Sequence, residues 1–547
     1  MKRTLILGGL LTAMAATAAV AEDASLPLRV EQAIQARVEA GEYPALVVAT
    51  IDGESSAVRS WGKLDDGRAP DADTLFEIGS ITKTFTATLL AQAVKNGKLQ
   101  LDTPVATLLP GFTLPERNGA AITLGMLAEQ DSGLPRLPGN LAPVDITDPY
   151  ADYDAAKLRA FLADYTLTRD PGASFEYSNL GYGLLGHALA THAGTDYATL
   201  LHKQVLAPLG MNSSGTTLPS SSHVRLARGH DPDGKPVPNW NFDVLAGAGA
   251  IRSTGADMLR YLAANLGTLD TPLSVALRFA QAPRRAVGAS EHIGLGWMTR
   301  HTPHGDITWH NGMTGGYASF IGFDARTRHG VVVLVNAQRS VDDLGFALLG
   351  DDTPLTSPRK AVAMDAAALN AYTGTYRLAP GFDLVVFRLG DSLQARATGQ
   401  GAFEILPSGD DAFFARAADI RIDFHRDANG DIDALTLHQA GHDSKAPRIA
   451  DAEAPPQTVT LDADTLRQYV GHYQLAPGAV FDVSLDKGQL TVKLAAQPSL
   501  PVYASARDAF FYTAVDAQIR FERDADGAVN ALVLHQNGVD QRATRLP

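Results

Sequence analysis

The 547-residue chain contains no cysteine, so no disulfide bond can staple it, and a chain of this length needs none. After the first 21 residues, no apolar run reaches the roughly 20 residues of a membrane-spanning helix. Basic residues are outnumbered: 46 Lys and Arg stand against 60 Asp and Glu, and they form no cluster. We therefore expect no membrane span and no nucleic-acid partner.

The signatures of several enzyme classes are missing. There is no H-E-x-x-H of zinc peptidases, no G-x-x-x-x-G-K-[ST] phosphate loop and no G-x-S-x-G elbow. The fifteen histidines are scattered. The stretches 427–430 and 524–527 suit hairpin turns better than calcium loops, since no Glu stands at the twelfth place. We expect no metal and no cofactor.

The first residues have the layout of an export signal. Lys2 and Arg3 precede an apolar stretch, and the small residues 19–21 precede Glu22. We expect residues 1–21 to be a cleaved signal peptide and the mature protein to be periplasmic or secreted. The missing cysteine after this segment excludes lipid attachment there.

The remaining length predicts two or three domains. Residues 22–350 mix helical and strand patterns, and the chain beyond them consists of short alternating segments with turn signals, as in all-β domains. We interpret residues 351–365 as a linker, and expect β-domains over 366–450 and 451–547.

These two β-domains contain a repeat. The stretch "FHRDANGDIDALTLHQ" at 424–439 returns as "FERDADGAVNALVLHQ" at 521–536, an offset of 97 residues. The same offset relates Tyr372, Gly374 and Tyr376 to Tyr469, Gly471 and Tyr473. So long a constant register indicates two homologous domains, and the alternating apolar residues suit small antiparallel barrels that close their own edges.

A serine three positions before a lysine is the first candidate for chemistry. The pattern occurs as Ser60/Lys63, Ser80/Lys83 and Ser357/Lys360. Only Ser80 opens a predicted helix, whose apolar stripe begins at Ile81, because Ser60 lies in a predicted strand and Ser357 precedes a proline in the linker.

This spacing places Ser80 and Lys83 on one helical face, where the lysine can reach the hydroxyl. Burial and the helix N-terminus would lower the pKa of Lys83 and leave a neutral amine to take the serine proton. The alternative is a serine that caps the helix and a lysine that snorkels to the surface.

A second candidate is Tyr177-Ser178-Asn179, the one Y-x-N among fifteen tyrosines, placed just before another helical run. Tyr177 could relay a proton between the nucleophile and the leaving group, and Asn179 could hold both the lysine and a substrate amide. The alternative is a simple Asn-Leu-Gly turn.

The third candidate lies in "ITWHNGMTGGYASFIGFDARTRHGVVVLVNAQ". Residues 307–310 end a predicted strand, and strands are expected at about 317–324 and 330–336. Glycines on either side of Met313-Thr314 would let a substrate backbone approach a strand edge closely.

In this order, S-x-x-K, Y-x-N and H-x-G resemble the penicillin-recognising serine hydrolases of the class C β-lactamase and DD-peptidase group. The stretches "DTLFEIGSITKTFTATLLAQAVKNGKLQLDTPVATLLPG", "ITLGMLAEQDSGLP" and "AGAGAIRSTGADMLRYL" are similar to that group as well. The resemblance covers roughly residues 25–345. It implies an α+β catalytic domain with an antiparallel sheet flanked by helices, ahead of two lipocalin-like barrels.

The resemblance makes Ser80 the acylated nucleophile, Lys83 its base or proton shuttle, and Tyr177 the acid/base at the leaving group. Asn179 becomes a substrate-amide anchor. The backbone N–H groups of Ser80 and Met313 become the oxyanion hole.

In the third motif, His310, Asn311 and Gly312 are expected to bind substrate. His310 stands where lactamases of the group have lysine, which is closer to DD-peptidases, D-aminopeptidases and esterases. Asn311 replaces the usual threonine or serine, so recognition of a substrate carboxylate is in question. Residues 129–131 also depart from the group, in a stretch that is often richer in His and Thr.

These observations predict an exported serine hydrolase that forms an acyl-enzyme on Ser80 and cleaves D-amino-acid-containing peptides, as a D-aminopeptidase or DD-peptidase does. An esterase or β-lactamase of the same fold is the alternative, so the substrate is a small peptide, an ester or a β-lactam. A non-catalytic binding protein that retains the pocket is a further alternative, although the complete set of catalytic residues argues against it. No feature of the sequence indicates an oligomeric state. By analogy with relatives, the barrels would narrow the entrance to the site.

Overall fold

The computed structural model describes residues 26–546 except 359, 380–381, 399–401, 417–419, 440–441, 452–457, 477–478, 487, 495–498, 513–516 and 537–538. The expected signal peptide, residues 1–21, lies outside the described residues. Among the residues that are described, no helix is both long and apolar enough to cross a membrane.

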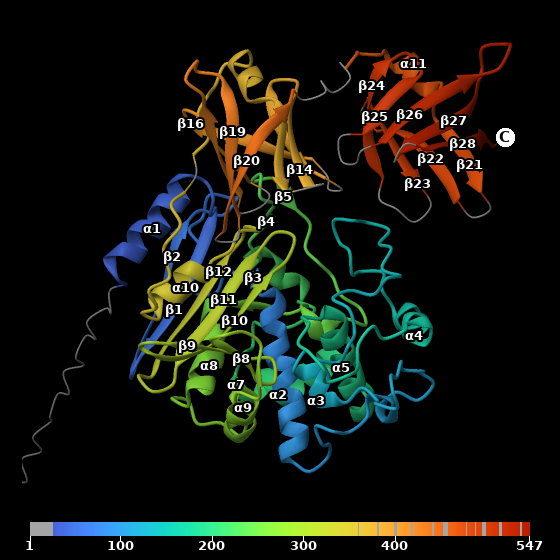
Figure 1. Cartoon of the computed structure of the whole chain (residues 1–547). Coiled ribbons are helices and arrows are strands. Elements are labelled where there is room, and N and C mark those ends of the chain that lie inside the picture. Colours follow the sequence, from blue (N-terminus) through green and yellow to red (C-terminus); the bar gives the residue numbers. More distant parts are fainter. Residues whose placement is uncertain are drawn as a thin grey trace, which may run out of the picture.

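An eight-stranded antiparallel sheet organises the first part of the chain (Figure 1), in the order β2-β1-β12-β11-β10-β9-β8-β7. The strands are β1 (Ala45–Asp52), β2 (Ser55–Gly62), β7 (Arg285–Ala286), β8 (Glu291–Ile293), β9 (Met298–Thr302), β10 (Gly305–Met313), β11 (Ala318–Asp324) and β12 (His329–Val335). Strands β11 and β12 confirm the two strands expected after the H-x-G motif. Pairing of β1 with β12 joins the two ends of this part in one sheet.

Both faces of the sheet are covered by helices. Helices α1 (Leu28–Glu39) and α10 (Asp342–Leu348) pack on one face, and α8 (Gly255–Leu266) packs on β1 and β12 from the other. In β12, Val332 and Leu334 point to one core while Val331 and Val333 point to the other. A central strand buried on two sides must be apolar at every position, which explains the continuous run in the sequence.

The other α-helices of this first part of the chain lie on the same side of the sheet as α8 (Figure 1). They are α2 (Thr82–Lys95), α3 (Leu124–Ala128), α4 (Ala155–Asp164), α5 (Asn179–Ala193), α6 (Tyr197–Leu201), α7 (Ala207–Leu209) and α9 (Ser274–Gln281). Two short strand pairs complete this part: β3 (Leu75–Glu77) with β6 (Arg252–Thr254), and β4 (Gly229–His230) with β5 (Pro236–Val237).

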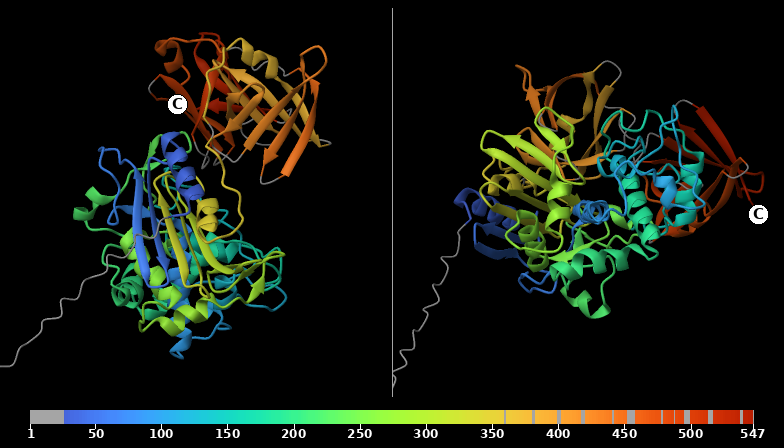
Figure 2. Two further views of the ribbon diagram at one scale, coloured as in Figure 1. Left: turned by 90° about the vertical axis from the view of Figure 1, so that its left-hand side faces the viewer. Right: turned by 90° about the horizontal axis from the view of Figure 1, so that it is seen from below.

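Two closed eight-stranded antiparallel barrels follow and confirm the predicted architecture. The first contains β13 (Gly374–Ala379), β14 (Phe382–Leu389), β15 (Ser392–Ala397), β16 (Phe403–Gly409), β17 (Ala412–Ala415), β18 (Ile420–Arg426), β19 (Ile432–Gln439) and β20 (His442–Ala450). The second contains α11 (Ala463–Arg467), β21 (Gly471–Ala476), β22 (Ala479–Asp486), β23 (Gln489–Leu494), β24 (Leu500–Ala506), β25 (Ala509–Tyr512), β26 (Ala517–Arg523), β27 (Val529–Gln536) and β28 (Val539–Arg545). Both barrels lie at one end of the first part (Figures 1 and 2).

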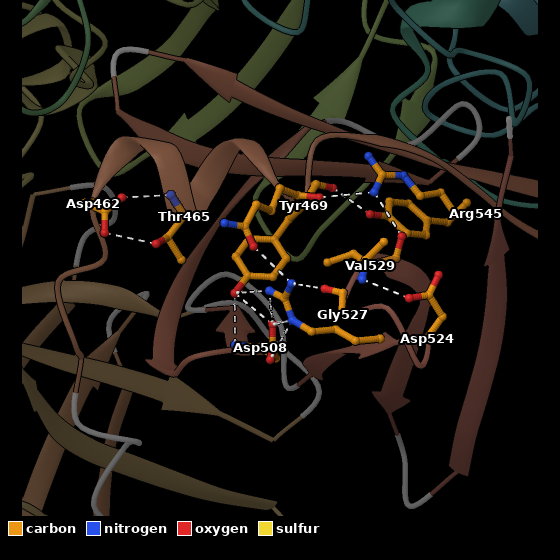
Figure 3. Close-up of polar contacts among 12 residues, drawn as sticks. Asp462, Thr465, Tyr469, Asp508, Asp524, Gly527, Val529 and Arg545 are labelled. Atoms are coloured by element: carbon orange, nitrogen blue, oxygen red, sulfur yellow. Dashed lines mark hydrogen bonds and ion pairs between the residues drawn. The ribbon is translucent and has the colours of Figure 1, made fainter.

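The two barrels share a hydrogen-bonded cluster of one tyrosine, one aspartate and one arginine at equivalent repeat positions, which we call the latch. In the second barrel Tyr469 donates a hydrogen bond of 2.9 Å to Asp508, and Arg523 Nη2 donates one of 2.7 Å to the same carboxylate (Figure 3). Tyr372, Asp411 and Arg426 form the equivalent contacts in the first barrel. The arginine also donates to the turn that follows its strand, so the latch ties two hairpins together.

Candidate active site

The turn before α2 brings Ser80 against strand β10. Residues Gly79–Ile81 form a 3₁₀ turn, and α2 begins only at Thr82. Gly79 has φ +48°, and a Cβ there would lie 2.7 Å from the backbone nitrogen of Met313. Only glycine permits this close approach with that backbone conformation.

Lys83 is fully buried beside the serine. Its Nζ lies 2.9 Å from Ser80 Oγ, 2.9 Å from Asn179 Oδ1 and 2.8 Å from the carbonyl oxygen of Ala248. No side chain caps α2, and Lys83 has no exposed surface. The alternative of a capping serine with a snorkelling lysine is therefore wrong.

The surroundings of Lys83 favour its neutral amine. Burial, helped by the charge of Arg136, holds the pKa of Lys83 well below its ordinary value. Asn179 Oδ1 and Ala248 O can only accept, so they take the two N–H bonds of a neutral amine. The third contact of Nζ is with Ser80 Oγ, so a neutral amine would direct its lone pair at this hydroxyl.

Tyr177 lies over this pair. Its ring centroid is 4.8 Å from Lys83 Nζ and 6.4 Å from the ring of His310. Burial raises the pKa of Tyr177 to about 12, and a hydrogen bond with Ser80 acts in the opposite direction. The phenol is thus protonated at neutral pH and lies next to Ser80.

Asn179 is the first residue of α5, so the Y-x-N segment leads into a helix and the turn alternative is wrong. Asn179 accepts from Lys83, and its Nδ2 donates to Tyr150 Oη over 3.4 Å. Gln130, at φ +61°, accepts the backbone N–H of Ser178 over 2.7 Å. This contact gives the unusual residues 129–131 a role, because Gln130 fixes the segment that carries Tyr177 and Asn179.

Strand β10 extends past His310 to Met313. Its alternate residues His310 and Gly312 lie on the side of Ser80. At Gly312 a Cβ would lie 2.0 Å from the carbonyl oxygen of Ile78, so only glycine fits there. Burial and then the nearby Lys83 lower the pKa of His310 to about 3, so the imidazole is neutral. His310 Nδ1 lies 2.5 Å from Asn311 O, and since a carbonyl only accepts, Nδ1 carries the proton.

Asn311 points to the other face of the sheet. It alternates with His310 along the strand, and Ile307 and Trp309 on its own face pack in the core of α1 and α10. Its Nδ2 donates to Asp342 Oδ2 over 2.7 Å. The structure therefore gathers Ser80, Lys83, Tyr177, Asn179, His310 and Gly312, and places the side chain of Asn311 apart from them.

The end of β10 is an open edge. Strand β9 pairs only as far as Trp309. Thr314 N–H bonds to Tyr317 O, and alternation in an antiparallel pair then turns the N–H of Met313 away from β11. This N–H points to the side of β10 on which the turn with Gly79 and Ser80 lies.

The sequence marked Gln130 only as part of a departure from the group, and it gave no indication of Arg136, Tyr150, Ala248 or Asp342. Arg136 lies with its guanidinium 5.0 Å from the Tyr177 ring centroid. These residues come from segments distant in sequence, without a motif. For Asn311 a signal existed, since the apolar residues at 307 and 309 share its face.

A serine within hydrogen-bond distance of a buried lysine, with a tyrosine over both and an open strand edge beside them, is the arrangement expected of a serine hydrolase. Residues 30–349 match the Beta-lactamase family, and the chain belongs to this family, whose members are serine hydrolases that act through an acyl-enzyme. Residues 358–449 and 455–545 each match one domain family of unknown function, DUF3471, in agreement with the repeat.

Several known proteins are similar over the first part of the chain. The D-alanyl-D-alanine-carboxypeptidase/endopeptidase AmpH of Escherichia coli is 29% identical over 342 residues, which cover 57% of this chain and 86% of the relative. A penicillin-binding protein of Bacillus subtilis is 25% identical over 423 residues, 71% of this chain and 91% of its own. A solved class C β-lactamase superposes with a TM-score of 0.52 at 25% identity, covering 59% of this chain and 96% of its own.

Proposed function

We propose that this protein is an exported serine hydrolase that forms an acyl-enzyme on Ser80 and cleaves D-amino-acid-containing peptides. The observation that carries the proposal is the buried Lys83, whose Nζ lies within hydrogen-bond distance of Ser80 Oγ, Asn179 Oδ1 and Ala248 O. A neutral amine at this distance can deprotonate the serine at neutral pH.

In the first half-reaction the substrate carbonyl oxygen lies between the backbone N–H groups of Ser80 and Met313. Ser80 Oγ attacks the carbonyl carbon, and its proton passes to Lys83 Nζ. The tetrahedral oxyanion is stabilised by the two N–H donors. Collapse breaks the bond to the leaving group, which takes its proton from Tyr177, and Lys83 reprotonates the tyrosine.

In the second half-reaction water attacks the acyl-enzyme carbonyl. The water proton passes to the Tyr177–Lys83 pair, and the restored Ser80 hydroxyl leaves with that proton. No further group is required, because the same residues serve as base and then as acid.

The choice of substrate class rests on the relatives and on His310. A D-alanyl-D-alanine-carboxypeptidase/endopeptidase is among the similar proteins, and so are β-lactamases. His310 is a neutral hydrogen-bonding group. The β-lactamases that this chain resembles have a lysine at this position. This difference favours peptidase or esterase chemistry over efficient lactam hydrolysis.

The experiment is intact-mass spectrometry of the mature protein after incubation with a penicillin or with D-alanyl esters and peptides, beside Ser80→Ala. We expect an adduct, or turnover of substrate, with wild type alone. Equal activity of Ser80→Ala would refute the nucleophile. Preference for L- over D-substrates would refute the substrate class, and turnover of esters alone would indicate an esterase.

Export has its own test. The mature protein recovered from the periplasm or medium of a bacterial host should begin at Glu22, as read by N-terminal sequencing. Retention of residues 1–21 on the active protein would refute cleavage.

A further inference from the structure

A cavity of about 550 Å³ opens beside the catalytic edge of β10. Its lining includes Met313 and Trp309 from β10, Asp342 and Phe346 from α10, and Arg416 from the first barrel. Met313, whose backbone lies against the turn that carries Ser80, and Asp342 therefore line the same cavity.

Asp342 is the one carboxylate on this wall whose partners are neutral. Its neighbour Asp343 is paired with Arg37, and Arg300 is paired with Glu291 and Asp351. Asp342 accepts from Asn311 and Ser340 instead. Among the described residues no cation forms an ion pair with it, and the charge of Arg300 acts on it only from beyond ion-pair distance. A half-buried anion that lacks a counter-ion is complementary to a cation brought by a ligand.

Four arginines line the cavity, and two of them, Arg37 and Arg300, are the ones already paired with other carboxylates. Arg339 and Arg416 also line a neighbouring pocket, which Met313 and Asp342 do not. That pocket is lined by three carboxylates as well, Glu42, Asp231 and Asp233. Each of the four arginines thus lies beside other carboxylates, and Asp342 has no ion-pair partner of its own among the described residues.

The site fixes which half of the substrate meets Asp342. Tyr177, the proton donor to the leaving group, is near His310, and Met313 supplies the oxyanion donor three residues further along β10. The leaving group therefore extends from Met313 toward His310 and passes Asn311, the residue that holds Asp342. At about 3.4 Å per residue, Asn311 is roughly 7 Å from Met313, the reach of one amino-acid residue.

We propose that Asp342 is a specificity-determining residue that selects leaving groups carrying an ammonium group and rejects those carrying a carboxylate. This inference rests on the proposed acyl-enzyme at Ser80. It makes a C-terminal residue with a free carboxylate a poor leaving group, and a blocked or basic residue a good one.

The test uses thioesters that share the best D-amino acyl donor of the mass assay and differ in the thiol released: cysteamine, 2-mercaptoethanol or thioglycolate. Transfer to Ser80 Oγ breaks the C–S bond, and the thiol leaves with the proton delivered by Tyr177. Assays at pH 8 keep Asp342 ionised, because burial raises its pKa only to about 6. The rate of thiol release gives kcat/KM for each substrate.

For Asp342→Asn relative to wild type, we expect kcat/KM to fall at least tenfold for the cysteamine ester. It should rise severalfold for the thioglycolate ester and stay within twofold for the neutral ester. Asp306→Asn, an equal charge change at an exposed site on the same strand, should leave all three unchanged. Should Asp342→Asn fail to fold, Asp342→Ser provides the same comparison.

Parallel changes for all three esters would overturn the inference and leave Asp342 a purely structural role. A wild type that hydrolyses the esters without regard to charge would also overturn it while the proposed function stands. A wild type that no ester and no penicillin acylates would refute both.

Discussion

At the scale of the residue, the protonation state of Lys83 decides whether the site can work. Lys83→Arg places a permanently charged guanidinium in the buried site, where it cannot accept a proton. We expect acylation of Ser80 to slow by about 10²–10⁴-fold. Stopped-flow acylation by a chromogenic ester measures this, and a wild-type rate in the variant would contradict the role of Lys83 as base.

The same reasoning gives a pH dependence. Burial lowers the pKa of Lys83, so the amine is neutral above that folded-state pKa and protonates below it. Acylation should fall on the acid side with a single titration, and the Lys83→Arg variant should lack this limb. An identical acid limb in both proteins would assign it to another group.

His310 makes stability depend on pH. Its pKa is lowered to about 3 in the folded protein, mainly by burial, against about 6.5 unfolded. Between these values the unfolded chain binds the extra proton, so the free energy of unfolding falls as pH drops, by at most about 1.4 kcal/mol per unit from this group. His310→Gln should show a shallower fall in denaturant titrations from pH 6.5 to 4, and equal slopes would contradict the assignment.

At the scale of the element, the 3₁₀ turn and strand β10 fit together through glycine. Gly79→Ala adds a Cβ that would lie 2.7 Å from Met313 N, whereas Gly53, also at positive φ, has no neighbour within 4 Å. Both substitutions carry backbone strain of about 1–3 kcal/mol. Only Gly79→Ala should in addition separate Ser80 from the oxyanion edge, with at least a tenfold loss of acylation rate, and equal losses in the two variants would contradict this.

The barrel latch is also an element-scale feature. Asp508 has φ +69°, which Asn tolerates, so Asp508→Asn keeps the backbone and removes the charge that holds Arg523. We expect the second barrel to lose about 1 kcal/mol, because the pair is partly exposed. Thermal unfolding followed by far-UV circular dichroism measures this loss of stability. Asp411→Asn is the matched change in the first barrel. Two unchanged melting curves would leave the latch without a stabilising role.

At the scale of the molecule, the first barrel shares a cavity with the catalytic part. Phe414, Ala415 and Arg416 line the cavity that also contains Met313. The catalytic sheet closes through β1 and β12 without the barrels, so a chain lacking residues 366–547 should fold. We expect it to accept larger peptides, measured as the ratio of kcat/KM for long and short substrates. An unchanged ratio in a folded truncation would count against this role.

That Ser80, Lys83, Tyr177 and Asn179 lie together could be predicted from the sequence because each motif is short. Ser80 and Lys83 are one helical turn apart, and Tyr177 and Asn179 flank a helix start, so local geometry already restricts them. The strands after His310 and the 97-residue repeat could also be predicted, because alternation and self-similarity are properties of the sequence itself.

What the sequence by itself determined is the chemistry of the groups and the number of folded units, because both are encoded in local patterns. The tertiary structure alone decided what surrounds those groups. Ala248 reaches Lys83 across 165 residues, and Asp342 reaches Asn311 across 31. Burial, which sets the pKa of Lys83, and the charge beside the leaving group arise only when such distant segments pack together.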